Sequence, residues 1–148
     1  MTRSATLRRL MLSEDLTVLM EAHNGLTARL VEEAGFEALW ASGLSISASL
    51  GVRDCNELSW SQVLDVVAFM TDATELPILV DADSGFGDFN NLRRFVRKAE
   101  QIGVAGICVE DKRFPKTNSF VASESQALAD VDEFANKLRA AKDAQLDP

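Results

Sequence analysis

The chain has little cysteine, one histidine and no cluster of basic residues. Its two cysteines, Cys55 and Cys108, are far apart and form no C-x-x-C pair, which argues against a disulfide framework and a structural zinc site. This cysteine usage is typical of a reducing compartment, so we predict a cytoplasmic location. His23 is the only histidine, and a lone histidine is more often structural than functional.

The net charge argues against two classes of partner. The chain carries 15 basic and 23 acidic side chains, a formal net charge of −8. We therefore expect neither nucleic acid nor an anionic membrane surface as its main partner. No apolar run approaches the roughly 18 residues of a membrane-spanning helix, and no P-loop or G-x-G-x-x-G fingerprint indicates nucleotide binding. A small-molecule substrate remains, and it can be anionic if a metal supplies positive charge.

What is present is the composition of one globular domain. The 148 residues are 47% hydrophobic and 26% charged, as in ordinary folded proteins, and we expect a single domain over residues 1–148. Residues 1–13 lack the apolar region and cleavage site of a secretory signal. They are expected to form a short capping helix.

Short continuous apolar runs, typical of buried strands, alternate with longer amphipathic stretches, typical of helices. The predicted strands are residues 16–20, 36–40, 78–80 and 106–109, and the predicted helices are residues 26–34, 60–71, about 90–101 and about 132–144. Ser59 is expected to cap the second helix, and Asn90 or Asn91 the third. Four successive β–α units with short connections predict parallel strands and an α/β fold.

Two architectures fit this pattern, an open doubly wound sheet and part of a TIM-type (β/α)8 barrel. The predicted strands lead into polar or small residues at His23-Asn24, Ser42-Gly43, Asp81-x-Asp83 and Glu110. Functional groups at the ends of all consecutive strands are typical of a barrel, whereas an open sheet concentrates them at one switch point. Because a whole barrel needs about 250 residues, we predict about half of a barrel.

Asp81 and Asp83 are the sharpest local signal. Alternate residues of an extended segment point the same way, so both carboxylates can converge on one hard cation if the segment is still strand-like there. Glu110, at the end of the neighbouring predicted strand, brings a third carboxylate to the same edge. The predicted metal ligands are therefore Asp81, Asp83 and Glu110, with Mg²⁺ as the ion and Mn²⁺ as an alternative. The other interpretation is that the two aspartates are solvated loop or N-cap acids.

Further candidates lie in two loops expected near this edge. Asp54 is either a nucleophile or electrostatic partner of the metal site, or an ordinary loop acid in a salt bridge. Lys116 and Asn118 lie on a polar segment, residues 113–129, whose length is typical of an active-site lid. A solvated connection is the alternative for that segment.

Three residues at the end of the second predicted strand can form a binding pocket. Ser42 and Gly43 can offer backbone N–H groups to an anionic oxygen, and glycine permits close approach of the backbone. Trp40 can line the pocket wall.

Several of these segments together resemble the phosphoenolpyruvate phosphomutase family of the isocitrate lyase superfamily. The D-x-D-x-G-x-G element is shared across the superfamily, whereas E-D-K-x-F-P-K-T-N-S is characteristic of the mutase branch. The matching segments are Ala22-His23-Asn24, Trp40-Ala41-Ser42-Gly43-Leu44-Ser45, Gly51-Val52-Arg53-Asp54, Asp81-Ala82-Asp83-Ser84-Gly85-Phe86-Gly87 and Glu110-Asp111-Lys112-Arg113-Phe114-Pro115-Lys116-Thr117-Asn118-Ser119.

The resemblance implies Mg²⁺-dependent interconversion of phosphoenolpyruvate and phosphonopyruvate, the reaction that makes the C–P bond of phosphonate biosynthesis. It implies direct metal binding by Asp81, with Asp83 and Glu110 reaching the ion largely through water. The implied catalytic residues are Asp54, Lys116 and Asn118, and the implied substrate-binding residues are Trp40, Ser42, Gly43 and Ser119. It also implies the N-terminal half of the barrel, and a homo-oligomer for the full-length protein.

Two departures from the family shape the remaining expectations. The lyases carry a catalytic cysteine in a K-x-C-G-H type loop, where this chain has Lys116-Thr117-Asn118-Ser119, so C–C cleavage is not expected. Asn118 favours the mutase over the related phosphonopyruvate hydrolases, which are the alternative. The chain lacks the second half of the family's barrel, so we expect an N-terminal fragment. If the product ends at Pro148, we expect little turnover and self-association through open strand edges, or a non-catalytic half-barrel binding module.

Overall fold

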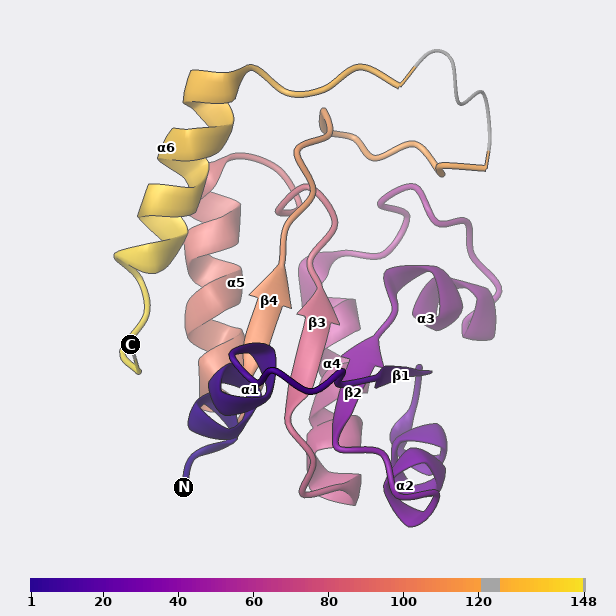
Figure 1. Ribbon diagram of the computed structural model, residues 1–148. Coiled ribbons are helices and arrows are strands. Elements are labelled where there is room, and N and C mark those ends of the chain that lie inside the picture. The colour runs from indigo at the N-terminus through magenta and orange to yellow at the C-terminus, as the bar shows by residue number, and fades with distance from the viewer. Residues whose placement is uncertain (121–125, 148) are drawn as a thin grey trace.

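The structure, a computed structural model, describes residues 1–120 and 126–147. Its centre is a parallel four-stranded sheet in the order β1-β2-β3-β4, so each strand pairs with the next one along the chain (Figure 1). The strands are β1 (Leu19–Ala22), β2 (Ala38–Ala41), β3 (Ile78–Asp81) and β4 (Gly106–Cys108), and the helices are α1 (Arg3–Met11), α2 (Gly25–Glu33), α3 (Gly43–Ser49), α4 (Trp60–Ala73), α5 (Phe89–Gln101) and α6 (Val131–Lys142). This is the predicted succession of four parallel β–α units.

Most helices begin where the sequence supplies a capping side chain. Ser59 forms a capping box at the start of α4, as predicted. The predicted cap of α5 was wrong, because Asp88 is the N-cap and its carboxylate accepts hydrogen bonds from the backbone N–H groups of Asn90 and Asn91. A carboxylate also interacts favourably with the positive end of the helix dipole, which an asparagine side chain does not.

The first strand lies later in the chain than the sequence predicts. The apolar run at residues 16–20 favours a strand there, but pairing with β2 begins at Leu19 opposite Ala38. Leu16 lies outside the sheet and is 92% exposed. Pairing with the neighbouring strand, rather than local hydrophobicity, therefore decides where β1 begins.

Helix α3 was not expected from the serine-rich sequence that follows β2. Ser42 caps it by accepting a hydrogen bond from the backbone N–H of Ser45, and Ile46 is fully buried beneath it. Ile46, Ala48 and Leu50 alternate with serines in this stretch, and such alternation gives no helical periodicity. The helix forms because a cap and one buried contact are sufficient in this tertiary setting.

The two faces of the sheet carry different chemistry. Successive side chains of a strand point to opposite faces. In β3, Ile78 and Val80 belong to the main apolar core with the residues of α2, α4 and α5, and both are fully buried. Burying each such side chain contributes about 2 kcal/mol. Leu79 and Asp81 occupy the alternate positions and face the other side.

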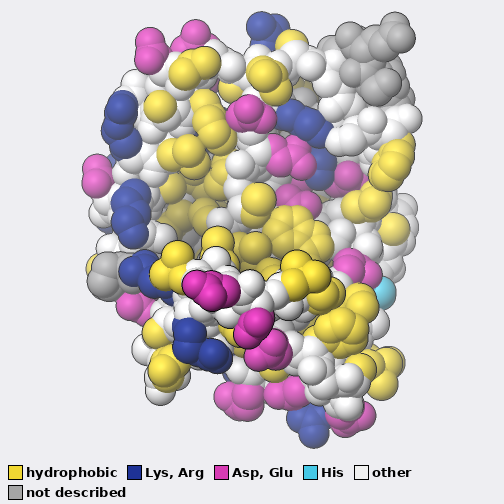
Figure 2. All heavy atoms as spheres, viewed as in Figure 1, with side chains coloured by type: hydrophobic (Ala, Val, Ile, Leu, Met, Phe, Trp, Pro, Cys, Tyr) yellow, Lys and Arg dark blue, Asp and Glu magenta, His cyan; other side chains and the backbone are white. Residues whose placement is uncertain are grey.

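Helix α1 lies across the beginning of the strands on that second face (Figure 1), as the expected capping helix. Leu7 and Leu10 pack with Ala38 and Leu79 in a separate small core. Gly106 permits this contact, because a Cβ there would lie 2.9 Å from a methyl carbon of Leu7. Figure 2 shows apolar side chains over the middle of this face, with acidic and basic side chains above them. Charged groups of this face thus lie at the carboxyl ends of the strands, and further acidic and basic side chains lie below the apolar region.

Helix α6 packs against α5 at the β4 side of the molecule (Figure 1). Across residues 1–120 and 126–147, none of the helices combines the length and apolarity needed to cross a membrane.

Candidate active site

Asp81 is the central carboxylate of the site. It is the last residue of β3 and is 9% exposed. One oxygen, Oδ2, accepts a hydrogen bond from Gly43 N at 3.2 Å, and the other, Oδ1, accepts one from Asp83 N at 3.0 Å. A Cβ on residue 43 would lie 3.1 Å from Asp81 Oδ2 and 3.3 Å from Asp83 Oδ1. Glycine at this position therefore lets both carboxylates approach the start of α3.

The carboxylate of Asp83 also lies near Gly43, but an extended strand does not place it there. Asp83 is not an extended residue, because its φ is +47°, in the left-handed region that aspartate tolerates better than most residues. Gly85 N closes the turn by donating to Ala82 O at 2.8 Å. The two aspartates therefore lie together because of a turn stabilised by hydrogen bonds, and not because a strand places alternate side chains on one face.

Lys116 brings the segment after β4 onto these carboxylates. Its side chain is 4% exposed, and Nζ lies 3.0 Å from Asp54 Oδ1 and 2.5 Å from Asp83 Oδ1. Asn118 Nδ2 donates to Asp54 Oδ2 at 3.3 Å. The three residues predicted as catalytic, Asp54, Lys116 and Asn118, thus share one hydrogen-bonded network although they come from segments more than 60 residues apart.

Burial and neighbouring charges shift the pKa values of Asp83 and Lys116. Burial raises the pKa of Asp83 to about 6, helped by the charges of Asp81 and Asp54 and opposed by Lys116. For Lys116, burial favours the neutral amine, but the hydrogen bond and charge of Asp83 outweigh it, so the pKa lies above its ordinary value. Lys116 is therefore an ammonium group at neutral pH and supplies positive charge rather than acting as a base.

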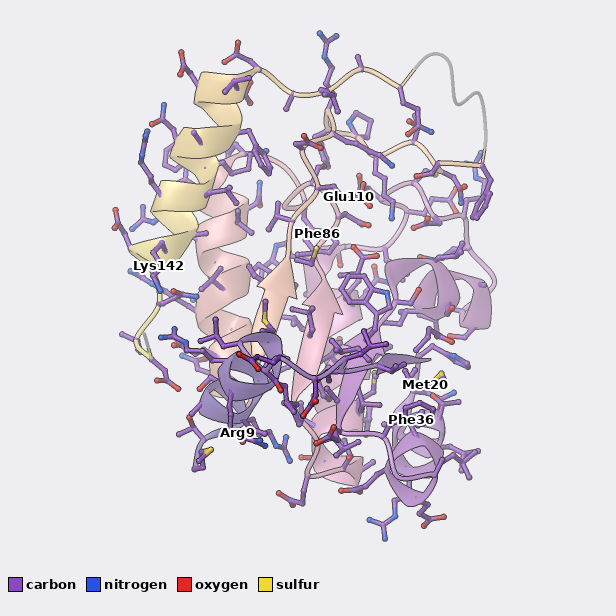
Figure 3. All side chains as sticks on the ribbon, in the orientation of Figure 1. Arg9, Met20, Phe36, Phe86, Glu110 and Lys142 are labelled. Carbon is purple, nitrogen blue, oxygen red and sulfur yellow. The ribbon has the colours of Figure 1, made fainter. Side chains whose placement is uncertain are left out.

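Glu110 carries the third predicted metal carboxylate and follows β4 (Figure 3). Its backbone N–H donates to Asp83 O at 2.7 Å, which joins the two strand ends. Oε2 is buried, makes no hydrogen bond within the described residues, and lies 3.2 Å from Lys112 Nζ. This buried carboxylate oxygen therefore has unused capacity to bind a cation.

The donor set fits Mg²⁺. Among residues 1–120 and 126–147, the ion pairs of the carboxylates of Asp54, Asp83 and Glu110 are with the ammonium groups of Lys112 and Lys116. With Asp81 included, the four carboxylates and two ammonium groups have a net charge of −2. Carboxylate oxygen is the ligand type that hard divalent cations prefer, and Mg²⁺ usually keeps several waters. In the described part of the chain, however, no three acidic, histidine or cysteine side chains converge closely enough to enclose an ion by themselves.

The predicted substrate-binding residues lie around this network but are engaged elsewhere. The Ser42 hydroxyl caps α3, and its backbone N–H donates to Ala22 O at 3.4 Å. Trp40 is half-buried on β2, and the hydroxyl of Ser119 bonds Lys112 Nζ. The assignment of these residues to substrate remains a prediction.

Two residues with evident roles were missed in the sequence. Asn56 donates to Asp83 and accepts from the backbone of Lys116. Lys137 of α6 is 7% exposed and donates to the backbone oxygens of Ser84 and Gly87, in the loop after Asp83. Neither shows a sequence signal beyond its residue type, because its partners lie at least 27 residues away. His23, by contrast, pairs with Glu21 on the edge strand β1.

Comparison with known proteins identifies the family. The family model described as phosphoenolpyruvate phosphomutase matches residues 7–148. The chain belongs to the phosphoenolpyruvate phosphomutase family. It is 54% identical over 147 residues to the phosphoenolpyruvate phosphomutase of Tetrahymena pyriformis, with 99% of this chain and 49% of the relative covered. It is 39% identical to the phosphonopyruvate hydrolase of Variovorax sp., with 99% and 51% covered.

Solved structures agree with this assignment and confirm the fold class. The crystal structure of phosphoenolpyruvate phosphomutase from Streptomyces platensis subsp. rosaceus superposes with a TM-score of 0.94 at 46% identity, covering 98% of this chain and 50% of that one. A phosphonopyruvate hydrolase in complex with oxalate and Mg²⁺ superposes with a TM-score of 0.89 at 38% identity, with 99% and 50% covered. The chain spans about half the length of these relatives. Its four β–α units form the N-terminal half of a TIM-type barrel.

Proposed function

We propose that the chain supplies the metal-binding and lid side of a phosphoenolpyruvate phosphomutase site. The reaction interconverts phosphoenolpyruvate and phosphonopyruvate and makes the C–P bond of phosphonates. The observation that carries this proposal is the network in which Lys116 lies between Asp54 and Asp83 while Asn118 bonds Asp54. It places an ammonium group and an amide N–H donor beside carboxylates suited to a divalent cation.

The chemistry of phosphoryl transfer explains why these groups suit the reaction. Its loose transition state spreads negative charge over the phosphoryl oxygens, so catalysis depends on positioning and charge stabilisation. The Lys116 ammonium and the Asn118 amide are donors for those oxygens. Asp54 accepts from both side chains, and it thereby holds the two donors beside each other.

Magnesium would be held by Asp81 directly, with Asp83 and Glu110 contributing mainly through water. When bound, it supplies Lewis-acid stabilisation of negative charge on the carboxylate and enolate oxygens of the substrate. The lid segment carrying Lys116 and Asn118 excludes water, which would otherwise hydrolyse the transferred group. Calorimetric titration with Mg²⁺, and with oxalate in its presence, tests whether the site binds a metal and an enolate-like ligand.

A second candidate, phosphonopyruvate hydrolysis, has one observation in its favour, the 39% identity to a hydrolase. The mutase is preferred because identities to two phosphomutases are 54% and 53% and because Asn118 is present. Phosphorus NMR on phosphonopyruvate decides between them. A phosphate ester signal supports the mutase, free phosphate supports the hydrolase, and no change with the protein as its cell makes it would contradict both.

Location and assembly belong to the same proposal. We infer a cytoplasmic enzyme whose full-length form is a homo-oligomer acting on a small-molecule substrate. Cell fractionation and the sedimentation of the protein as its cell makes it test these two points. A non-catalytic binding module would bind Mg²⁺ and oxalate without converting phosphonopyruvate.

A further inference from the structure

The side-chain amide of Asn56 links Asp83 to the backbone of Lys116. Asn56 lies in the loop between α3 and α4, half-buried. Its Nδ2 donates to Asp83 Oδ2 at 2.9 Å, and its Oδ1 accepts from the backbone N–H of Lys116 at 2.6 Å. One amide group thus joins a loop, a proposed metal carboxylate and the lid segment.

These two hydrogen bonds fix groups that otherwise have freedom to move. Asp83 Oδ1 bonds Lys116 Nζ and Oδ2 bonds Asn56, so the carboxylate is held at both oxygens and cannot rotate without breaking a bond. The bond to Lys116 N holds the backbone at the base of the lysine side chain. Because this bond does not involve the ammonium group, rotation of the lysine side chain does not by itself break it.

Asparagine is suited both to donating to Asp83 and to accepting from the backbone of Lys116. Residue 56 has φ +59°, a left-handed conformation in which asparagine is enriched among the non-glycine residues. Its amide offers a donor and an acceptor on one planar group. Aspartate would lose the donor toward Asp83 and add a like charge, and glycine would keep the backbone but lose both bonds.

We propose that Asn56 is a positioning residue for phosphoryl transfer, acting through Asp83 and Lys116 rather than on the substrate. The inference rests on the proposed function in taking Lys116 as a donor to the transferring group. Misplacement of a reacting group by about 1 Å can cost about a hundredfold in rate. Loss of Asn56 is therefore expected to lower kcat roughly tenfold to a hundredfold, with KM changed less than about threefold, because the groups that it positions act mainly in the transition state.

Two variants, made in the protein as its source cell produces it, distinguish an effect on the position of the reacting groups from an effect on folding. Asn56→Gly keeps the left-handed backbone and removes both bonds, so kcat falls and hydrogen exchange at the Lys116 amide becomes about tenfold faster. Asn56→Asp keeps the acceptor for Lys116 N, so this amide stays protected while kcat still falls. The exposed Asn90→Ala, on the first turn of α5, serves as the matched control and leaves both readouts unchanged.

Each result decides the inference. A kcat within about twofold of the parent in either Asn56 variant, or unchanged exchange at Lys116 in Asn56→Gly, overturns it. If Asn56→Gly loses activity by unfolding, seen as a lowered Tm, the kcat of the folded Asn56→Asp variant decides. An inactive parent would refute the proposed function instead, and the exchange measurement would still show whether Asn56 holds Lys116.

Discussion

Replacing Lys116 by methionine removes the ammonium group that lies between Asp54 and Asp83. The lysine side chain is 4% exposed and the two carboxylates are 8% and 9% exposed, so water cannot solvate the carboxylates in place of the ammonium group. Each pair attracts by about 6 kcal/mol at an effective dielectric of about 20, but the ammonium also loses its own hydration on burial. Removing one partner of a buried pair typically costs about 3–5 kcal/mol, because it leaves the other charge uncompensated.

Urea unfolding followed by far-ultraviolet circular dichroism, in chelator to remove divalent ions, measures this cost. We expect Lys116→Met to lower the free energy of unfolding by about 3–5 kcal/mol. Lys142→Met is the matched control, because Lys142 is exposed on α6 (Figure 3). A surface substitution of that kind changes stability by about 0.5 kcal/mol or less.

Magnesium adds a second, independent expectation for the same variant. A divalent cation replaces the missing positive charge, so Mg²⁺ should stabilise Lys116→Met more than it stabilises the parent. A loss below about 1 kcal/mol in chelator would refute the reasoning, since solvent-exposed ion pairs typically contribute about 0–1 kcal/mol. It would mean that Lys116 does not lie between the two carboxylates in solution.

Three further predictions concern the supports of the site. Gly43→Ala places a Cβ 3.1 Å from Asp81 Oδ2 and is expected to cost about 1–3 kcal/mol of unfolding free energy and to weaken Mg²⁺ binding by calorimetry. Unaltered binding would show that the carboxylate can move aside. Lys137→Met removes the hydrogen bonds to the loop after Asp83. Because the ammonium group of the parent loses hydration when the protein folds, the free energy of unfolding is expected to fall by only about 1–3 kcal/mol in urea. An equally stable variant would contradict a role in holding that loop. Burial raises the pKa of Asp83 from 3.8 to about 6, so the folded metal-free protein binds this proton more tightly than the unfolded chain does. The contribution of Asp83 to stability is therefore greatest below pH 4 and decreases by about 3 kcal/mol as the pH rises through the folded pKa of about 6. Asp83→Asn should remove this component from unfolding curves in chelator, and an unchanged pH dependence would contradict the assignment.

The elements that the sequence predicts well are those set by local rules. The run around Ile78 and the amphipathic stretch after Ser59 became β3 and α4 close to their expected bounds, because burial period and capping act over a few residues. The predicted position of β1 was displaced toward the N-terminus, and α3 was not predicted. The start of β1 depends on pairing with β2, and α3 depends on one buried isoleucine and one cap, so both are decided by contacts outside their own sequence.

The candidate site shows the same division. Residue types and spacing alone singled out Asp81, Asp83 and Glu110 at neighbouring strand ends, because parallel β–α units return every strand to the same edge. They also indicated that Asp54 and the lid segment lie nearby. The argument from spacing required a strand-like segment at Asp83, and this condition is not met, because a left-handed turn places the residue.

By itself, the sequence determined the α/β class, the half barrel, the acidic edge and the resemblance to the mutase family, since each follows from local periodicity or from contiguous motifs. Only the tertiary structure decided which groups meet. It placed Lys116 between two aspartates, left Glu110 Oε2 without a hydrogen bond among the described residues, and revealed Asn56 as the link between Asp83 and the lid. These contacts join residues 27 to 62 positions apart, and no local rule relates such positions until the chain has folded.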